Sequence, residues 1–192
     1  MGSSPTKQLL TEDLLEDYTS LTYLTKGEIY HLMKKFHSID PEKVNANFSH
    51  RFSRQEIINN FEVLKNNPFQ DRLFRVFSSE NDNQFSFEDI LDLCSAMSAA
   101  CPPHVKAAWA FRIFDIDEDN QINTTDICNI LDRLTRDSEN RNRCLDHDSK
   151  MKIANIILEE IKLDFTGGIG LSEFIFILSR IPEFSSSMYF RI

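Results

Sequence analysis

Residues 115–126 read DIDEDNQINTTD, and this stretch decides the fold. Its positions 1, 3, 5, 7, 9 and 12 are Asp115, Asp117, Asp119, Gln121, Asn123 and Asp126. This spacing is typical of a calcium-binding loop between two helices, in which those positions turn oxygen atoms toward one cation and position 7 uses its backbone carbonyl. Four carboxylates this close together would repel one another severely without a cation. A solvated polar loop is the alternative, but the stretch predicts a divalent-cation site.

Two residues of this loop depart from the usual pattern. Position 6, normally glycine, is Asn120, and asparagine tolerates the left-handed backbone conformation that the turn requires. Position 12, normally glutamate, is Asp126, whose side chain is one methylene shorter and reaches roughly 1 Å less far. The shorter side chain makes bidentate coordination difficult, and a six-coordinate shell favours Mg²⁺ relative to Ca²⁺. We therefore expect one Ca²⁺ or Mg²⁺ site here, with less preference for calcium than a sensor loop has.

The helix start that closes this loop recurs along the chain. A capping residue with an acidic residue three positions later is found at Ser53, Ser86, Asn123 and Gly170. The apolar residues just before these caps are Phe52, Phe85, Ile122 and Ile169. Such caps begin helices, and their recurrence indicates an internal repeat. The sequence thus predicts an all-α, two-lobed EF-hand fold of four helix–loop–helix repeats, in which these apolar residues stand at position 8 of each loop and form short β-bridges between paired loops.

Each loop also has a predicted incoming helix. The first opens at the capping box of Thr25 and Glu28, and the second at residues 67–68, where Pro68 takes the favoured first helical position. The third follows residues 102–103, two prolines that disfavour helix in the residue before them and so indicate the boundary between lobes. We expect an N-terminal extension with an acylation motif over residues 1–22, lobes over 23–100 and 101–184, and an apolar extension over 185–192.

The first two loops lack parts of the ligand set. The first offers only Asp40, which is followed by Pro41. Positions 1, 3, 5 and 12 of the second loop are Ser78, Glu80, Asp82 and Asp89. This loop has no aspartate at position 1 and no glycine at position 6, so we expect neither loop to bind a cation.

The fourth loop keeps most of the pattern but carries a lysine where the first ligand belongs. Asp164 and Glu173 stand at positions 3 and 12, while Lys162 takes position 1. An ammonium group at this point repels a metal ion. Our interpretation is that Lys162 pairs with Asp164 or Glu173, which leaves one cation site per chain, in the third loop.

Composition excludes several classes of protein. The 192 residues include 21 Lys and Arg against 30 Asp and Glu, a net charge of −9 that would repel nucleic acid. Mean hydropathy is −0.34, and no run approaches the ~18 apolar residues of a membrane-spanning helix. The four cysteines have no metal-site or redox spacing, which is typical of a reduced, cytoplasmic protein. With no nucleophile–base pair or phosphate loop either, we do not expect an enzyme.

The first residues read MGSSPT and match the pattern for myristoylation of Gly2. A single acyl chain holds a protein on a membrane only marginally and reversibly. We therefore expect a second contact to accompany the lipid.

With these residues placed, the chain resembles the calcium- and integrin-binding protein family over essentially its full length. The segments that carry the resemblance are residues 21–26 (LTYLTK), 64–69 (LKNNPF), 75–78 (RVFS), 85–89 (FSFED), 110–115 (AFRIFD) and 182–192. The resemblance implies silent first and second loops, aspartate at position 12 of the third, and frequent myristoylation. It also implies binding to helical segments in the cytoplasmic tails of membrane proteins, including integrin α subunits and transmembrane channel-like proteins. Lys162 departs from the family pattern, because the fourth loop normally binds calcium there.

The function that these features predict is a non-enzymatic adaptor at the inner face of the plasma membrane. It would grip an amphipathic helix from a membrane-protein cytoplasmic segment in a groove of the C-terminal lobe. Candidate residues for the groove floor are Leu131, Leu134, Phe174 and Leu178, although core packing explains each of them equally well. The alternative is a regulatory subunit of an enzyme, as in calcineurin B, which shares this architecture. A soluble ion buffer would keep more than one competent loop.

Acylation generates the first testable prediction. The myristoylation pattern requires glycine at position 2, so Gly2→Ala should prevent acylation and move the protein from the membrane to the cytosolic fraction. The matched control is Ser3→Ala, which leaves Gly2 in place. Unchanged fractionation of Gly2→Ala would mean that partner binding alone localises the protein.

Overall fold

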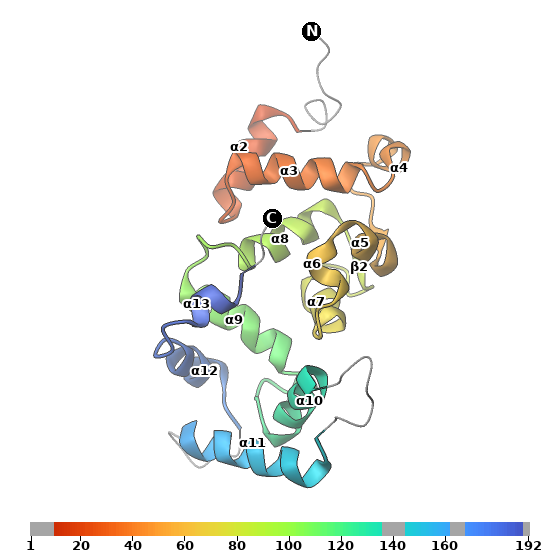
Figure 1. Ribbon diagram of the computed structural model, residues 1–192. Helices are drawn as coiled ribbons and strands as arrows, with labels where there is room; N and C mark the ends of the chain where they lie inside the picture. The colour runs from red at the N-terminus through yellow and green to blue at the C-terminus, as the bar shows by residue number, and fades with distance from the viewer. Residues whose placement is uncertain (1–9, 136–144, 162–167, 190–192) are drawn as a thin grey trace. The chain divides into compact units, whose positions relative to one another are not determined.

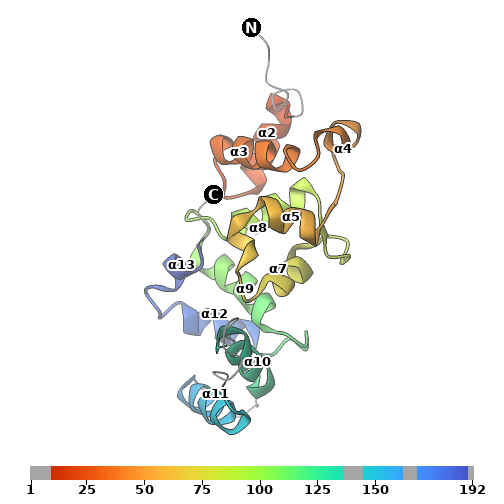
Figure 2. The ribbon, with the colours of Figure 1, turned by 45° about the vertical axis from the view of Figure 1, so that its right-hand side comes forward.

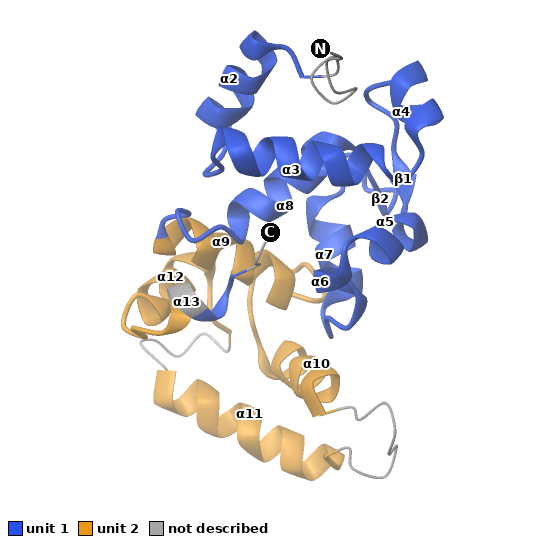
Figure 3. Ribbon diagram, turned by 45° about the horizontal axis from the view of Figure 1, so that its top comes forward, with its two compact units in different colours: residues 1–102, 185–192 blue, residues 103–184 orange. Residues whose placement is uncertain are grey.

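The computed structural model describes residues 10–135, 145–161 and 168–189 (Figure 1). They are mostly helical, and strand pairing is confined to short contacts between loops. The chain divides into two compact units, residues 1–102 with 185–192 and residues 103–184 (Figure 3). The predicted all-α fold of helix–loop–helix repeats is confirmed. Among the described residues, none of the helices combines the length and apolar character that crossing a membrane demands.

Unit 1 contains the first two repeats. Its elements are α2 (Glu12–Leu21), α3 (Lys26–His37), α4 (Pro41–Ala46), β1 (Phe52–Ser53), α5 (Arg54–Asn60), α6 (Glu62–Lys65), α7 (Gln70–Phe77), β2 (Gln84–Phe85) and α8 (Phe87–Ala96). The first repeat runs from α3 to α5 and the second from α7 to α8. The predicted capping boxes begin α3, α5 and α8, at Thr25, Ser53 and Ser86. Each such cap is worth about 1 kcal/mol of helix stability.

The loops of unit 1 are joined by the antiparallel pair β1–β2, in which Phe52 lies opposite Phe85. Both side chains are fully buried. The Phe52 ring contacts Phe36 edge-on at 5.0 Å between centroids, and the Phe85 ring stacks on Phe74 at 4.4 Å. The apolar residues at position 8 thus join the loops, as the sequence predicts, and they also anchor the loops in a phenylalanine-rich core.

The first loop is occupied by helix α4. Asp40 caps this helix, because its Oδ1 atom accepts a hydrogen bond from the Lys43 N–H at 3.1 Å. Hydrogen bonding to Lys43 also lowers the pKa of Asp40 below its ordinary value. The one candidate ligand of this loop, Asp40, is therefore committed to starting a helix, which gives a physical reason for the loop's expected silence.

Two helices of unit 1 differ from the sequence predictions. Helix α7 begins at Gln70, not at Pro68, because the Asn67 side chain accepts from the Phe69 N–H at 2.8 Å and holds a turn there. Helix α2 was not predicted from any sequence pattern. It is packed into unit 1 by buried Leu15 and Tyr18, whose hydroxyl donates to Glu88 Oε1 at 2.7 Å.

Unit 2 contains the last two repeats. Its helices are α9 (Pro103–Phe114), α10 (Thr124–Thr135), α11 (His147–Ile161) and α12 (Leu171–Leu178), and α13 (Phe184–Ser187) begins at its last residue. Helix α10 packs against α11, as Figures 1 and 2 both show, and α9 packs against α12. The two loops are joined by the predicted bridge between Ile122 and Ile169, whose N–H and C=O groups exchange two hydrogen bonds of 2.9 Å.

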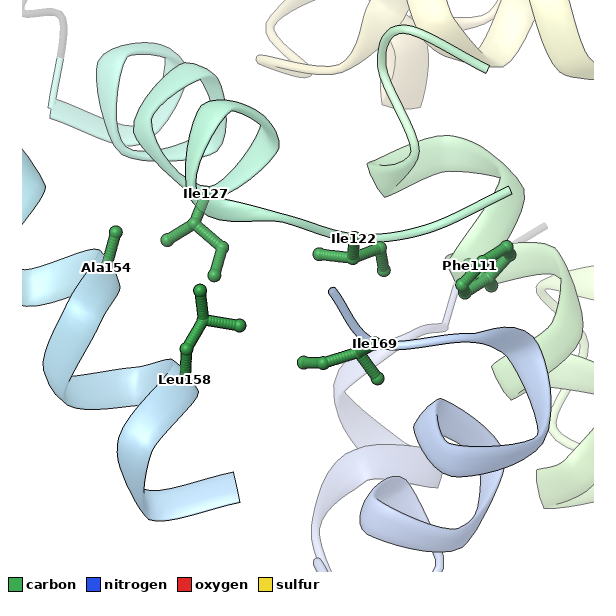
Figure 4. Close-up of a cluster of buried hydrophobic side chains, with 6 residues drawn as sticks. All are labelled: Phe111, Ile122, Ile127, Ala154, Leu158 and Ile169. Atoms are coloured by element: carbon green, nitrogen blue, oxygen red, sulfur yellow. The ribbon is translucent and has the colours of Figure 1, made fainter. Parts of the chain in front are cut away.

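The bridge lies at the centre of the unit 2 core. Ile122 and Ile169 lie side by side between helix α9 and helices α10 and α11 (Figure 4). The buried members of this core cluster are Phe111, Ile122, Ile127, Ala154, Leu158 and Ile169. The bridge therefore sets the positions of both loops relative to the helices that carry them.

Candidate metal centre

The third loop joins the end of α9 to the start of α10. Glu118 and Asn120 at positions 4 and 6 both have positive φ, 61° and 67°. Asparagine at position 6 thus adopts the left-handed conformation that glycine usually supplies, as the sequence predicts. The turn folds the loop back on itself, so that its two ends approach one another.

Three carboxylates converge in this loop. Asp115, Asp117 and Asp126 each place one oxygen atom within 4.8 Å of the others. Asp126 is fully buried, Asp115 is nearly so, and Asp117 is exposed. Burial is the largest cause that raises the pKa of Asp115, and the nearby charge of Asp126 raises it further. Carboxylate oxygens are the ligands that Ca²⁺ and Mg²⁺ prefer, so the donor set fits a divalent cation.

Backbone N–H groups orient the two buried carboxylates. Asp126 Oδ1 accepts from the Ile116 N–H at 2.9 Å, and its Oδ2 accepts from the Asn123 N–H at 3.1 Å. The Asp115 oxygens accept from the Asp119 N–H at 3.2 Å and from the Asn120 N–H at 3.0 Å. The capping pattern in the sequence implies the Asn123 donor, whereas residue types and spacing did not reveal the other three. They hold the position 1 and position 12 carboxylates in the loop before any ion arrives.

The other three predicted ligands have different surroundings. Among the described residues, the Asp119 carboxylate is not one of the three that converge. Its Oδ1 atom accepts from the Gln121 N–H at 2.8 Å. The Asn123 side chain accepts from the Thr125 N–H at 2.7 Å and so caps α10. The Gln121 side chain extends toward the fourth loop. Its Oε1 atom lies so close to Gly168 that a Cβ atom at that residue would be only 2.6 Å away. Their coordination of an ion remains a prediction.

The fourth loop lies partly outside the described residues. Lys162 and Asp164 belong to residues 162–167, so their predicted pairing falls there. At the end of the loop, Glu173 Oε2 accepts from the Gly170 N–H at 2.8 Å. Gly2 and its acylation motif also fall outside the described residues.

The candidate groove residues have unequal surroundings. Leu131 and Phe174 pack against the core cluster of unit 2, and the Phe174 ring contacts Phe111 edge-on. Leu134 is 60% exposed, and Leu178 is half-buried at the end of α12. Core packing thus explains Leu131 and Phe174 at least in part, whereas Leu134 is available to a partner.

Comparison with known proteins gives a consistent set of relatives. No protein-family model matches the chain. Calcium and integrin-binding family member 2 of Drosophila melanogaster is 30% identical over 187 residues, which cover 95% of this chain and 96% of that protein. The human family member 2 is 28% identical and the human family member 3 is 29% identical, each over 195 residues and the whole of this chain. The similarity therefore extends across both units.

The first prediction from this site concerns the number of ions. Calorimetric titration with calcium should give about one ion per chain, because the complete oxygen pattern occurs once. Asp115→Ala should abolish this binding, since it removes a buried carboxylate at position 1. Asp148→Ala, which removes an exposed carboxylate of the same unit, should leave it unchanged. Two calcium sites of similar strength would contradict the prediction.

The second prediction concerns ion selectivity. Asp126→Glu restores the longer position 12 side chain and should raise the affinity for calcium relative to magnesium by about tenfold, or ~1.4 kcal/mol. The measurement is calcium titration with and without competing magnesium. Asp148→Glu lengthens an exposed carboxylate of the same unit outside the loop and serves as the control. An unchanged ratio in Asp126→Glu would show that reach does not set selectivity.

Proposed function

The chain belongs to the calcium and integrin-binding family, and on that premise we propose that it is a non-catalytic adaptor that binds a helix of a membrane protein. The relatives are named for binding calcium and integrin. In this proposal the third loop holds Ca²⁺ or Mg²⁺, and unit 2 receives an amphipathic helix from a cytoplasmic segment. Integrin α tails and segments of transmembrane channel-like proteins are the candidate partners. An N-myristoyl group on Gly2 would add the membrane contact and keep the protein at the inner face of the plasma membrane.

One observation carries this proposal: helix α12 is strongly apolar, yet none of its residues is buried. Six of its eight residues, LSEFIFIL, are apolar. Leu171 and Phe176 are each 43% exposed. Apolar side chains that gather on one helix and stay partly in water are typical of an interaction site. The free energy gained by covering such surface is about 25 cal/mol per Å², which favours an apolar partner.

Two other helices of unit 2, α10 and α11, also expose apolar side chains. Leu134 near the end of α10 is 60% exposed, and Ile156 on α11 is 55% exposed. A partner helix with apolar residues at positions i, i+3, i+4 and i+7 presents a stripe of matching character. The net charge of −9 favours a partner helix whose polar face is basic.

The bridge between the loops supports binding that is largely constitutive. Ile122 and Ile169 join the loops through backbone hydrogen bonds, so one ion in the third loop acts on both. A ligand shifts a conformational equilibrium only by its differential affinity for the two states. A single ion of low selectivity differs little in its affinity for the two states, whether it is Ca²⁺ or Mg²⁺. Mg²⁺ at resting calcium levels would therefore keep unit 2 able to bind its partner.

A regulatory subunit of an enzyme, similar to calcineurin B, is the alternative. It would use the same apolar surface on a helix of a catalytic subunit. Co-immunoprecipitation from native tissue with mass spectrometry distinguishes the two, because the adaptor should recover a membrane protein and the regulatory subunit a catalytic chain.

The proposed function is tested by titrating an integrin α-tail peptide into the full chain. We expect binding in magnesium alone, and a gain of less than about tenfold, or ~1.4 kcal/mol, when saturating calcium is added. A larger gain would restore a calcium switch. Phe176→Ser should weaken peptide binding at least fivefold, because it removes exposed apolar surface from α12. Val63→Ser, an equally exposed apolar residue of unit 1, is the matched control. Equal affinities for the two variants would exclude α12 from the binding surface.

A further inference from the structure

The second loop contains the side chain of Arg51, a residue that precedes this loop in the sequence. Arg51 directly precedes β1, and its side chain is 13% exposed. Its Nη2 and Nε atoms donate to the two carboxylate oxygens of Asp82, at 2.8 and 3.2 Å. Its Nη1 atom donates to Asp89 Oδ2 at 2.9 Å, and the Asp89 side chain is 2% exposed. One guanidinium group thus joins the position 5 and position 12 carboxylates of this loop.

The same guanidinium contacts further oxygen atoms that an ion in this loop would contact. Nη2 donates to Ser78 Oγ at 3.0 Å and to the Gln84 carbonyl at 2.7 Å. Ser78 stands at position 1, and position 7 supplies its backbone carbonyl to the ion in loops of this type. Glu80 at position 3 completes the set, with its Oε2 atom 3.9 Å from Nε. The partners of Arg51 therefore include the oxygens at loop positions 1, 3, 5, 7 and 12, together with Ser79 Oγ at position 2, to which Nη1 donates at 2.9 Å.

The backbone of the second loop repeats that of the third. Asn81 and Asn83 have φ of 55° and 59°, at positions 4 and 6, where Glu118 and Asn120 have positive φ in the third loop. The two left-handed residues therefore occur at the same positions in both loops.

The carboxylates are oriented by the same donors as well. Asp89 Oδ1 accepts from the Ser79 N–H at 3.0 Å, and its Oδ2 accepts from the Ser86 N–H at 2.8 Å. Asp126 is held by the N–H groups at the same two loop positions, 2 and 9. The second loop thus shares the backbone arrangement of the candidate metal centre although its ligand set is poorer.

We propose that the Arg51 guanidinium is the built-in cation of the second loop, so that unit 1 keeps the cation-bound loop arrangement without a metal ion and becomes a divalent-cation site when this side chain is removed. The group fits this role because its planar fork of N–H donors matches carboxylate geometry and its charge is permanent. Hydrogen bonding to Arg51 is also the largest cause that lowers the pKa of Asp82 below its ordinary value.

The arrangement explains how the first two loops work together. The first loop has lost its ligands to helix α4, and the residue just before its β-strand supplies a cation to the paired loop. The β1–β2 pair fixes that residue beside the second loop, because Phe52 is held opposite Phe85. Unit 1 is then indifferent to calcium, whereas the candidate metal centre lies in unit 2.

The test compares full-length variants in which the third loop has been silenced by Asp115→Ala. In this background the chain should take up no calcium in calorimetric titration, because Arg51 fills the second loop. Adding Arg51→Ala should lower the melting temperature in excess EDTA and create about one calcium site per chain. Millimolar calcium should then restore much of the lost melting temperature. A third change, Asp82→Ala, should abolish the new site and so locate it in the second loop.

Arg54→Ala, added to the same background, is the matched control, because Arg54 is an exposed arginine three residues away. It should create no calcium site. If Arg51→Ala is unfolded in EDTA, recovery of its circular dichroism on adding calcium supports the proposal equally. Three results would overturn it: an unchanged melting temperature, a loss that calcium does not reverse, or calcium binding that survives Asp82→Ala.

Discussion

The two hydrogen bonds between Ile122 and Ile169 fix the geometry on which unit 2 depends. They hold the third and fourth loops side by side and direct both isoleucines into the core cluster. Because Asp126 lies four residues after Ile122, at the start of α10, the position of its carboxylate is set by the same contact. In unit 1 the pairing of Phe52 with Phe85 holds the first and second loops together in the same way. The helices diverge from these two short bridges, so the loops and the core cannot be rearranged independently.

Much of this arrangement could be predicted from local sequence signals. Capping residues and the apolar residue at position 8 are short-range patterns, and they located α5, α8, α10 and both bridges. Asp115 and Asp126 were identified in the same way, because ligand spacing within a loop is local. The sequence pattern predicted the start of α7 two residues too early, at Pro68. In the structure the Asn67 side chain holds a turn there, which competes with the helical preference of Pro68.

Long-range contacts were beyond such patterns. Helix α2 is held by contacts such as that of Tyr18 with Glu88, seventy residues away. The role of Arg51 was likewise invisible, because it stands outside the loop whose carboxylates it joins. Asp89 and Asp126 occupy the same loop position and are oriented by equivalent N–H groups, yet within the described part of the chain the structure gives an arginine partner to Asp89 alone. The difference lies in a neighbouring element and not in the loop itself.

The exposed apolar side chains of helix α12 also have a consequence for the solubility of the free protein. Exposed apolar surface favours self-association in solution. The net charge of −9 opposes this, because like-charged molecules repel one another in solution. Salt shortens the range of that repulsion, to about 10 Å at 0.1 M and about 3 Å at 1 M, while apolar contacts are not screened. We therefore expect the free chain to associate more readily as ionic strength rises.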